Sequence, residues 1–199
     1  IRDIPDFPKK GILFKDLTTV FKEPSLVNIV MDAFLSYYSG KGITKVAGIE
    51  SRGFILGSIL AKELNAGFIP IRKPGKLPAA THAVKYELEY GTDIVEIHQD
   101  ALSSDDVVLL HDDLLATGGT AAASLELIRK SAVKEVYASF IVELAFLKGR
   151  DKLSNNLDIL SLALGPGDAG IGDADGLGLC LLGLNLNPLQ LVPGLKHGL

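Results

Sequence analysis

The chain has 199 residues, of which 47% are hydrophobic and 22% charged, and its formal net charge is −4. This length suffices for one domain with a sizeable core, and the mild acidity argues against nucleic acid as a partner, because nucleic-acid binding leaves a basic footprint. The single cysteine, Cys180, cannot form an intrachain disulfide, and no apolar run is long enough to span a membrane. The first residues carry charges and a proline and do not resemble a secretory signal. We therefore expect a soluble, cytoplasmic, globular protein that binds neither nucleic acid nor membrane.

The apolar pattern predicts short strands that alternate with helices. Apolar residues recur at helical spacing over 27–38 and 53–64, and a third helix is predicted from 118 to about 129. Short, continuously apolar runs are typical of strands buried on both faces. They occur at 45–49, 67–71, 107–110, 136–142 and 157–162. The alternation predicts an α/β fold with an open, mostly parallel, doubly wound sheet and helices on both faces.

Residues 73–98 interrupt this alternation. The segment 73–78 is punctuated by proline and glycine, which predicts an exposed, mobile loop. From Tyr86 to Ile97, polar and apolar residues alternate around a predicted Gly91-Thr92-Asp93 turn, and this pattern is typical of an antiparallel hairpin. An insertion of this kind is suited to act as a lid.

The most specific signal is the segment 107–120. Its apolar strand leads to two adjacent carboxylates, Asp112 and Asp113, and then to a turn of small residues that opens the third helix: Ala116, Thr117, Gly118, Gly119 and Thr120. Ligands bind at the carboxyl ends of strands in open α/β sheets, and free backbone N–H groups at a helix N-terminus bind anions. A sugar phosphate would suit both halves, because the acids can accept from its hydroxyls while the turn holds its phosphate. The alternative is a glycine-rich turn beside two solvated acids.

This segment resembles the phosphoribosyl-diphosphate motif of the type I phosphoribosyltransferases, and its flanks narrow the resemblance to the adenine-specific members. The resemblance runs from Ile4 to about Leu164 and defines a domain over 1–164. Further blocks carry it, at 6–8, 11–17, 48–54, 71–78, 86–91 and 142–150. It implies a small hood from about residues 1–20 and a flexible loop and hairpin over about 73–98. Residues 165–199 form a tail rich in glycine and leucine, with no stable periodicity and no assigned role.

The resemblance implies two anion sites. The turn Ala116–Thr120 would bind the 5′-phosphate, with Asp112 and Asp113 facing the ribose hydroxyls. The pyrophosphate would be held by four residues from two other blocks, Ser51, Arg52, Arg72 and Lys76. A guanidinium offers this dense anion a planar fork of donors. In this family the peptide between Glu50 and Ser51 is often cis.

The resemblance also implies an adenine slot and a catalytic acid. Phe14 and Leu144 would sandwich the base, and backbone groups around Leu13 and Lys15 would read its edge. Lys15 stands where many relatives carry arginine, so its own role is left open.

Glu89 matches the family's proposed general acid. A carboxyl group near N7 of adenine can share a proton there, an effect of about 10²–10⁴-fold. Glu87 lies on the same strand face by alternation, so the residue pattern alone does not separate the two glutamates.

The implied enzyme is a pentosyl-transferring glycosyltransferase of purine salvage. It would make AMP and pyrophosphate from adenine and 5-phosphoribosyl-1-diphosphate through an oxocarbenium-like transition state, as a homodimer. Mg²⁺ would enter with the diphosphate, held mainly by substrate and water rather than by dedicated protein ligands. For His111, beside the acid pair, we expect a hydrogen bond to a neighbour rather than a metal.

Two alternatives stay open. One is a transferase for hypoxanthine, guanine or xanthine, although such enzymes hold the 6-oxo group with a lysine where this chain has Val142-Glu143-Leu144. The other is a regulator that binds the diphosphate without turning it over, although such proteins normally add a DNA-binding domain and a basic surface.

Overall fold

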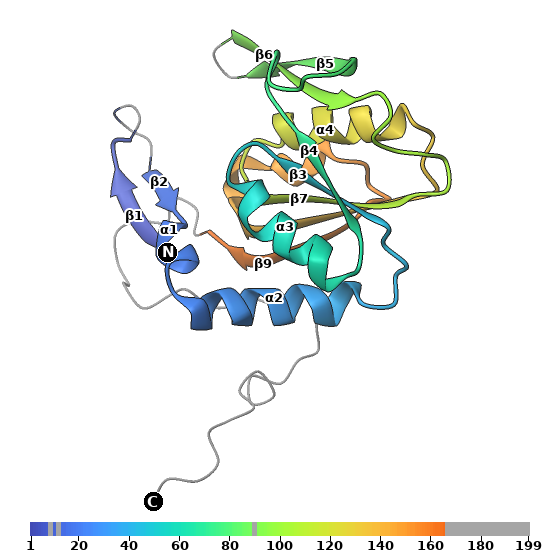
Figure 1. The fold of residues 1–199 in the computed structure, drawn as a ribbon. Coiled ribbons are helices and arrows are strands. Elements are labelled where there is room, and N and C mark those ends of the chain that lie inside the picture. The colour runs from blue at the N-terminus through green and yellow to red at the C-terminus, as the bar shows by residue number, and fades with distance from the viewer. Residues whose placement is uncertain (8–9, 11–12, 89–90, 166–199) are drawn as a thin grey trace, which may run out of the picture.

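A five-stranded parallel sheet forms the centre of the protein in this computed structural model, which describes residues 1–7, 10, 13–88 and 91–165 (Figure 1). Its strands are β3 (Lys45–Ile49), β4 (Gly67–Ile71), β7 (Val107–Leu115), β8 (Glu135–Glu143) and β9 (Asp158–Leu164). They lie in the order β4-β3-β7-β8-β9, and each neighbouring pair is parallel. The order of strands therefore changes direction between β3 and β7, which is where open α/β sheets bind ligands.

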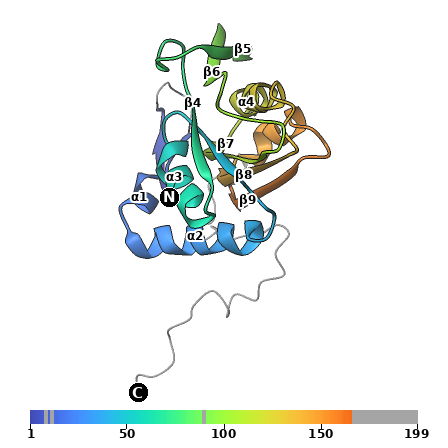
Figure 2. The same ribbon diagram turned by 45° about the vertical axis from the view of Figure 1, so that its right-hand side comes forward.

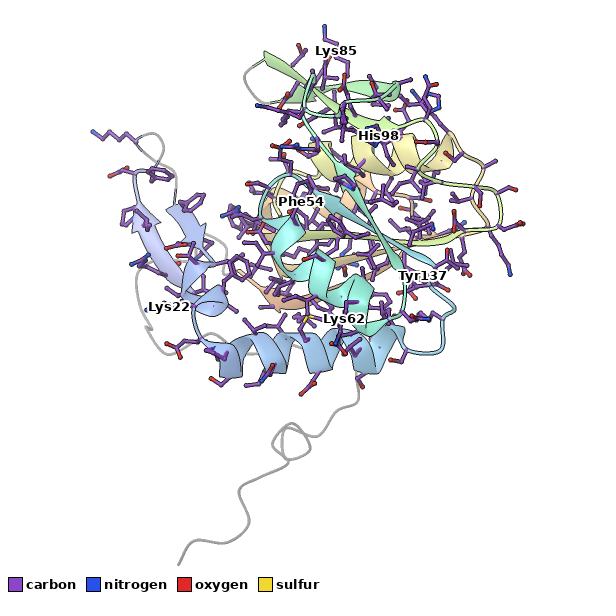
Figure 3. The ribbon with its side chains drawn as sticks, in the orientation of Figure 1. Lys22, Phe54, Lys62, Lys85, His98 and Tyr137 are labelled. Carbon is purple, nitrogen blue, oxygen red and sulfur yellow. The ribbon has the colours of Figure 1, made fainter. Side chains whose placement is uncertain are left out.

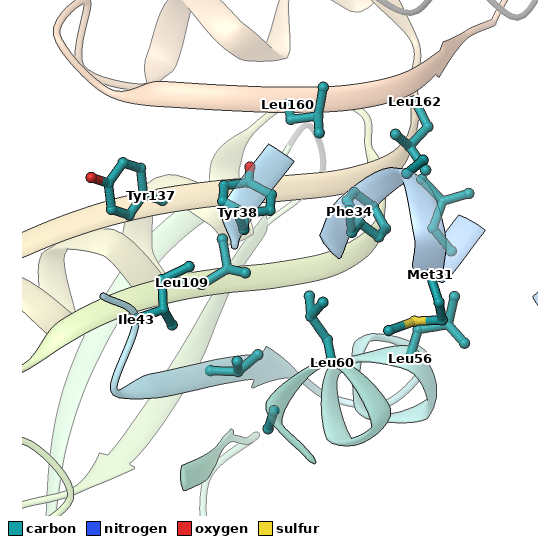
Figure 4. Packing of buried hydrophobic residues seen from close by; sticks show 14 of the residues in the cluster. Met31, Phe34, Tyr38, Ile43, Leu56, Leu60, Leu109, Tyr137, Leu160 and Leu162 are labelled. Atoms are coloured by element: carbon teal, nitrogen blue, oxygen red, sulfur yellow. The ribbon is translucent and has the colours of Figure 1, made fainter. Parts of the chain in front are cut away.

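Helices cover both faces of the sheet, as the sequence predicts (Figures 1 and 2). Helices α2 (Pro24–Tyr38) and α3 (Gly53–Glu63) pack on one face, and α4 (Gly119–Arg129) packs on the other. On the first face, Phe34 and Tyr38 of α2 and Leu60 of α3 meet strand residues such as Leu109 in a buried cluster (Figure 4). The Tyr38 hydroxyl donates to the Ala138 carbonyl oxygen at 2.7 Å, which satisfies its one buried polar group.

Two smaller antiparallel pairs flank the central sheet (Figure 1). The N-terminal pair, β1 (Arg2–Pro5) and β2 (Leu13–Asp16), is followed by the short helix α1 (Thr18–Phe21) and forms the predicted hood. The second pair is the hairpin β5 (Thr81–Leu88) and β6 (Gly91–His98), which packs against α4. Lys85 points from this hairpin away from the sheet (Figure 3).

The predicted turn at Gly91-Thr92-Asp93 is wrong, because these residues begin β6. Leu88 pairs with Gly91 and Glu87 with Thr92, so the connection falls at 89–90, outside the described residues. Main-chain pairing with β5 continues through these three residues, and the polar side chain of Asp93 has partners within the fold, described below.

Strand β7 also extends beyond its predicted end at residue 110. Main-chain pairing with β8 continues through Leu114 and Leu115, so both aspartates lie inside the strand rather than after it. Between β8 and β9 the chain forms two short 3₁₀ turns, η1 (Ala145–Leu147) and η2 (Gly149–Lys152). Among the described residues, each helix is too short or too polar to cross a membrane. The tail lies outside the described residues from 166 onward.

Candidate active site

The carboxyl ends of three neighbouring strands meet at one edge of the sheet. Ile49 at the end of β3 is opposite Ile71 at the end of β4, and Gly48 is opposite His111 on β7. The residues that follow β3 and β4 therefore lie beside the acid pair near the end of β7. The fold brings the predicted pyrophosphate residues, Ser51, Arg52, Arg72 and Lys76, to the same edge as Asp112 and Asp113.

The turn at 116–120 lines a pocket of about 90 Å³, together with Asp112, Leu114, Leu115 and Ala121. Gly118 has φ +77° and caps the N-terminus of α4, a conformation that L side chains rarely adopt. The first N–H groups of a helix have no partner within the helix, so this turn presents donors and the positive end of the helix dipole to the pocket. The arrangement is suited to a phosphate group.

A larger pocket of about 320 Å³ lies at the opposite edge of the sheet, where β8 and β9 begin. Its lining is polar and includes Arg129, Glu135 and Asp158. Ligands of open α/β sheets bind at the carboxyl ends of the strands, so position favours the smaller pocket as the active site despite its size.

Asp113 is buried and Asp112 half-buried, and the surroundings of both carboxyl groups favour the neutral form. Asp113 is only 2% exposed, and its Oδ2 lies 2.8 Å from Nε of Arg52, an ion pair without a well-aligned hydrogen bond. Burial raises the pKa of the Asp112 carboxyl well above its usual value, and the charge of Asp113 raises it further. Burial also raises the pKa of Asp113, although Arg52 opposes that shift. A cation or hydroxyl donors at this edge would relieve the repulsion.

Gly53 lets α3 begin directly against this part of β7. A Cβ atom at position 53 would lie 2.8 Å from the His111 carbonyl oxygen and 2.9 Å from Oδ1 of Asp112. That oxygen also accepts from the Asp113 backbone N–H at 2.9 Å. The absence of a side chain at 53 therefore allows the helix that carries Arg52 to approach the acid pair.

His111 is fully buried beneath the acid pair and is hydrogen-bonded as expected. Its Nδ1 lies 2.9 Å from Oγ of Ser139, and the Phe34 ring packs edge-on at a centroid distance of 5.5 Å. Burial lowers the pKa of His111 to about 4, so the imidazole is neutral at physiological pH. Its Nε2 is buried and has no hydrogen-bond partner among the described residues.

Glu50 organises the cationic part of the edge. Its carboxylate accepts from Nη2 of Arg72 at 3.0 Å and from Nε at 3.2 Å, and it also accepts from the Lys73 backbone N–H at 3.1 Å. Nη1 of Arg72 donates to the Lys76 carbonyl oxygen, which ties the start of the 73–78 loop together. The peptide between Glu50 and Ser51 is cis, as the resemblance implies. Ser51 and Lys76 are exposed and free to face a ligand.

Sequence reasoning missed a network that joins the hairpin to the phosphate-binding turn. The Tyr86 hydroxyl accepts from Thr120 Oγ1 at 3.0 Å and from Lys73 Nζ at 3.1 Å, and it donates to Asp93 at 3.2 Å. Lys73 is also paired with Asp93. The polar–apolar alternation of the hairpin predicts which side Tyr86 occupies, but nothing in the pattern identifies α4 as the partner of that side.

The hood brings Phe14 to the same edge. The Arg52 guanidinium lies over the Phe14 ring at 5.3 Å, and Phe7 packs edge-on against that ring at 5.1 Å. The Lys15 ammonium is bound by Asp3, at 2.7 and 2.8 Å from its two carboxylate oxygens, so this side chain is engaged within the hood. Leu144 is buried at the end of β8, and its N–H donates to the Leu115 carbonyl oxygen. The adenine slot between Phe14 and Leu144 stays a prediction.

The predicted catalytic acid cannot be located in this way. Glu89 lies outside the described residues, and so does the side chain of Leu13. Glu87 is exposed on β5. The choice between the two glutamates therefore stays a prediction.

Comparison with known proteins agrees with this geometry. The family model of the phosphoribosyl transferase domain matches residues 16–156, so the chain is a phosphoribosyltransferase. The adenine phosphoribosyltransferase of Bacteroides thetaiotaomicron is 57% identical over 162 residues, which cover 81% of this chain and 92% of that protein. The enzyme of Halothermothrix orenii is 54% identical and covers 81% of this chain and 95% of its own. The chain belongs to the adenine phosphoribosyltransferases, enzymes of purine salvage that form AMP.

Solved structures show the same fold. The adenine phosphoribosyltransferase of Rhodothermus marinus superposes with a TM-score of 0.76 at 49% identity, covering 79% of this chain and 90% of that one. The Saccharomyces cerevisiae enzyme, complexed with an imino-altritol bisphosphate and adenine, gives a TM-score of 0.75 at 40% identity, covering 80% and 92%.

Proposed function

We propose that this chain transfers the phosphoribosyl group of 5-phosphoribosyl-1-diphosphate to adenine at the edge formed by β3, β4 and β7. The observation that carries this proposal is the pocket of the 116–120 turn beside the Arg52–Asp113 pair. At this one edge of the sheet the chain offers backbone N–H donors for a phosphate, carboxylates for ribose hydroxyls and guanidinium groups for a diphosphate. These are the three polar parts of the donor substrate.

In the proposed reaction, N9 of adenine, in the tautomer that carries its proton on N7, forms a bond to C1 of the ribose while the bond from C1 to the diphosphate oxygen breaks. The N7 proton then passes to the Glu89 carboxylate. Pyrophosphate leaves with the bonding electrons toward Arg52, Arg72 and Lys76. Asp112 and Asp113 accept from the ribose hydroxyls and stabilise the positive charge that develops on the sugar ring. Most of the rate enhancement then comes from positioning and from charges fixed before the reaction begins.

We assign the base to a slot between Phe14 and Leu144, with backbone groups near Leu13 and Lys15 at its edge. Glu89 is proposed as the acid that shares a proton with N7, and the hairpin as the lid that excludes water. What supports the slot is the approach of Phe14 to Arg52, which brings the hood to the sheet edge. Bound adenine in the yeast relative is consistent with a base site in this fold.

Mg²⁺ is proposed to accompany the diphosphate, neutralising part of its charge while it leaves. The residues of this edge fit that role, because the cationic side chains of Arg52, Arg72 and Lys76 can contact some diphosphate oxygens and leave others for the metal. Mg²⁺ prefers oxygen ligands and keeps several waters, so phosphate oxygens and water suffice for most of its shell.

The direct test is turnover with adenine, and then with hypoxanthine, in the presence of the diphosphate substrate and Mg²⁺. We expect AMP and pyrophosphate with adenine and at least a hundredfold lower rate with hypoxanthine, because a site that hydrogen-bonds the 6-amino group rejects a 6-oxo group, an effect of about 10²–10⁵. Turnover with hypoxanthine alone would assign the chain to the 6-oxopurine enzymes. Binding without turnover would favour the regulator.

We also propose that the protein is a cytoplasmic homodimer. Support comes from exposed apolar side chains on two adjacent helices, Ile55 and Ile59 of α3 and Leu26 and Ile29 of α2, which are 38–43% exposed. Helix α3 follows Ser51 and Arg52, so a partner seated there would lie beside the proposed pyrophosphate site. Sedimentation should give the mass of a dimer, and Ile59→Lys should shift it toward the monomer.

A further inference from the structure

The block from Glu143 to Arg150 contains a partly buried ionic cluster to which the proposed reaction assigns no role. Glu143 is 5% exposed at the end of β8. The Arg150 guanidinium, in η2, donates to both of its carboxylate oxygens, from Nε at 3.0 Å and from Nη2 at 2.5 Å. Bidentate pairs of this kind fix geometry as well as charge.

Strand β9 completes this cluster, which we call the β8–β9 clamp (Glu143, Arg150 and Ser161). The Ser161 hydroxyl donates to Oε2 of Glu143 at 2.7 Å and accepts from Nη2 of Arg150 at 3.2 Å. Nη1 of Arg150 also donates to the Ile159 carbonyl oxygen at 3.3 Å. The clamp therefore ties η2 to the end of β8 and to the middle of β9.

Gly149, the neighbour of Arg150, lies in direct backbone contact with the phosphate-binding turn. A Cβ atom at Gly118 would lie 2.2 Å from the Gly149 carbonyl oxygen, and a Cβ atom at Gly149 would lie 2.0 Å from the Ala116 carbonyl oxygen. The main chain of η2 thus forms one wall of the turn. A turn built from alanine, threonine and glycine has little side-chain packing of its own, so its backbone position depends on this wall.

We propose that Glu143, Arg150 and Ser161 are positioning residues that hold Gly149 against the 116–120 turn and so set the spacing of its phosphate-binding N–H groups. This inference rests on the proposed phosphate role of the turn. None of the three lines the pocket of the turn, so their effect on binding is indirect. The clamp lies on the β8–β9 side of the turn, whereas Arg52, Arg72 and Lys76 follow β3 and β4, on its other side.

The experiment compares two ligands on the full chain by titration calorimetry, ribose 5-phosphate and inorganic pyrophosphate. Arg150→Lys keeps the charge but cannot reproduce the fork. We expect it to weaken ribose 5-phosphate binding about tenfold and to change pyrophosphate binding less than about twofold, because one or two hydrogen bonds are worth about 1 kcal/mol each. Ser161→Ala, a milder change, should weaken ribose 5-phosphate about threefold. In turnover, KM for the diphosphate substrate should rise more than kcat falls.

Asp158→Asn is the matched control. Asp158 is a carboxylate at the start of β9, outside the clamp, and like Glu143 it is paired with a cation, here Lys41. If it alters ribose 5-phosphate binding as much as Arg150→Lys does at equal loss of melting temperature, the clamp has only a general structural role and the inference is wrong.

The remaining outcomes are also decisive. Unchanged affinity of Arg150→Lys for ribose 5-phosphate would overturn the inference. If Arg150→Lys does not fold, unchanged affinity of Ser161→Ala for ribose 5-phosphate would overturn it instead. Absence of turnover by the unmodified chain would instead overturn the proposed function.

Discussion

Asp113 places a carboxylate where solvent hardly reaches, and the guanidinium of Arg52 is its charged partner. The pair joins the end of β7 to the loop after β3, so it orders two parts of the proposed site at once. Removing one member of a buried ion pair is costly, because the other charge is left without a partner. Without its negative charge, residue 113 would also no longer orient the Arg52 guanidinium.

Asp113→Asn should therefore lower kcat/KM for the diphosphate substrate about ten- to a hundredfold, because a hydrogen bond to a charged group is worth about 1.5–3 kcal/mol. The fold should be retained, because the amide has nearly the shape of the carboxylate. Steady-state kinetics and circular dichroism check both statements, with Asp105→Asn, an exposed aspartate at the opposite edge, as control. Unchanged kinetics would remove the ribose role.

The Asp112 carboxylate should lower the stability of the free protein at neutral pH, although it is proposed to bind the ribose. Its pKa is raised by burial and by Asp113, so the folded state holds its proton more tightly than the unfolded state does. Its contribution to stability is then fully present below the ordinary aspartate value of 3.8 and is lost as the pH rises through the raised pKa.

Asp112→Asn should accordingly stabilise the free protein at pH 7, by about 1 kcal/mol or roughly 2–4 °C in Tm. The amide oxygen can still accept from the Asp113 N–H. The gain should shrink as the pH is lowered toward 4, which thermal melts across this range will measure. A gain that does not depend on pH would mean that charge is not its cause.

At the scale of elements, one tyrosine hydroxyl links the hairpin to the first turn of α4, in addition to the bond from Lys130 Nζ to the Ala83 carbonyl oxygen and the apolar packing between hairpin and helix. That hydroxyl makes three hydrogen bonds, two as acceptor and one as donor, which is its full capacity. Lys73 connects the same hydroxyl to the loop after β4, and desolvation of the ammonium is outweighed by these partners, so the pKa of Lys73 is raised. The hairpin, the loop after β4 and the 116–120 turn are thus connected through Tyr86.

Tyr86→Phe should loosen this connection without unfolding the sheet. We expect amide hydrogen exchange in β5 and β6 to accelerate about tenfold, since the lost network is worth about 1 kcal/mol or somewhat more. Exchange in β7 and β8 should not change. Tyr37→Phe, which removes a hydrogen bond to Asp158 far from the hairpin, provides the comparison. Equal acceleration in both variants would contradict a local attachment.

Prediction from sequence succeeds here for elements that a local pattern of apolar residues defines. It fails for side-chain contacts whose two residues are distant in the chain. The apolar runs at 45–49 and 67–71 match β3 and β4 residue for residue, because short runs rich in apolar residues favour strands, even though β4 is an edge strand that is only partly buried. The apolar run predicts that β7 ends at residue 110, whereas the strand continues to Leu115, because Asp112 and Asp113 are polar residues inside it. Arg150 offered no local sign of its contact with Ser161, and the role of Tyr86 depends on Thr120, 34 residues away.

For the whole molecule, the described residues already contain a closed two-layer core. Both buried clusters are built from residues up to Leu162, and the last strand ends at Leu164. The sheet has helices on both faces, and its order changes direction between β3 and β7, where the proposed site lies.

A chain shortened to end at Gly165 should therefore keep its Tm within about 2 °C and its turnover within about twofold, because it retains both buried clusters and the described residues of the proposed site. Differential scanning calorimetry and the AMP-forming assay are the measurements. A large loss in either would assign residues 166–199 a part in folding or catalysis.

The bond between Thr120 and Tyr86 has a consequence for ligand affinity. A threonine hydroxyl has a single proton, so it can donate one hydrogen bond. In the free protein the Thr120 hydroxyl donates this bond to the Tyr86 hydroxyl. A phosphate oxygen that accepts this proton must end that donation, so the two acceptors compete. Because the two acceptors compete, thermodynamic linkage makes their effects on each other reciprocal. The factor by which the Thr120–Tyr86 hydrogen bond weakens anion binding at the turn equals the factor by which a bound anion weakens that hydrogen bond. Anion binding would therefore break one of the contacts between the hairpin and α4.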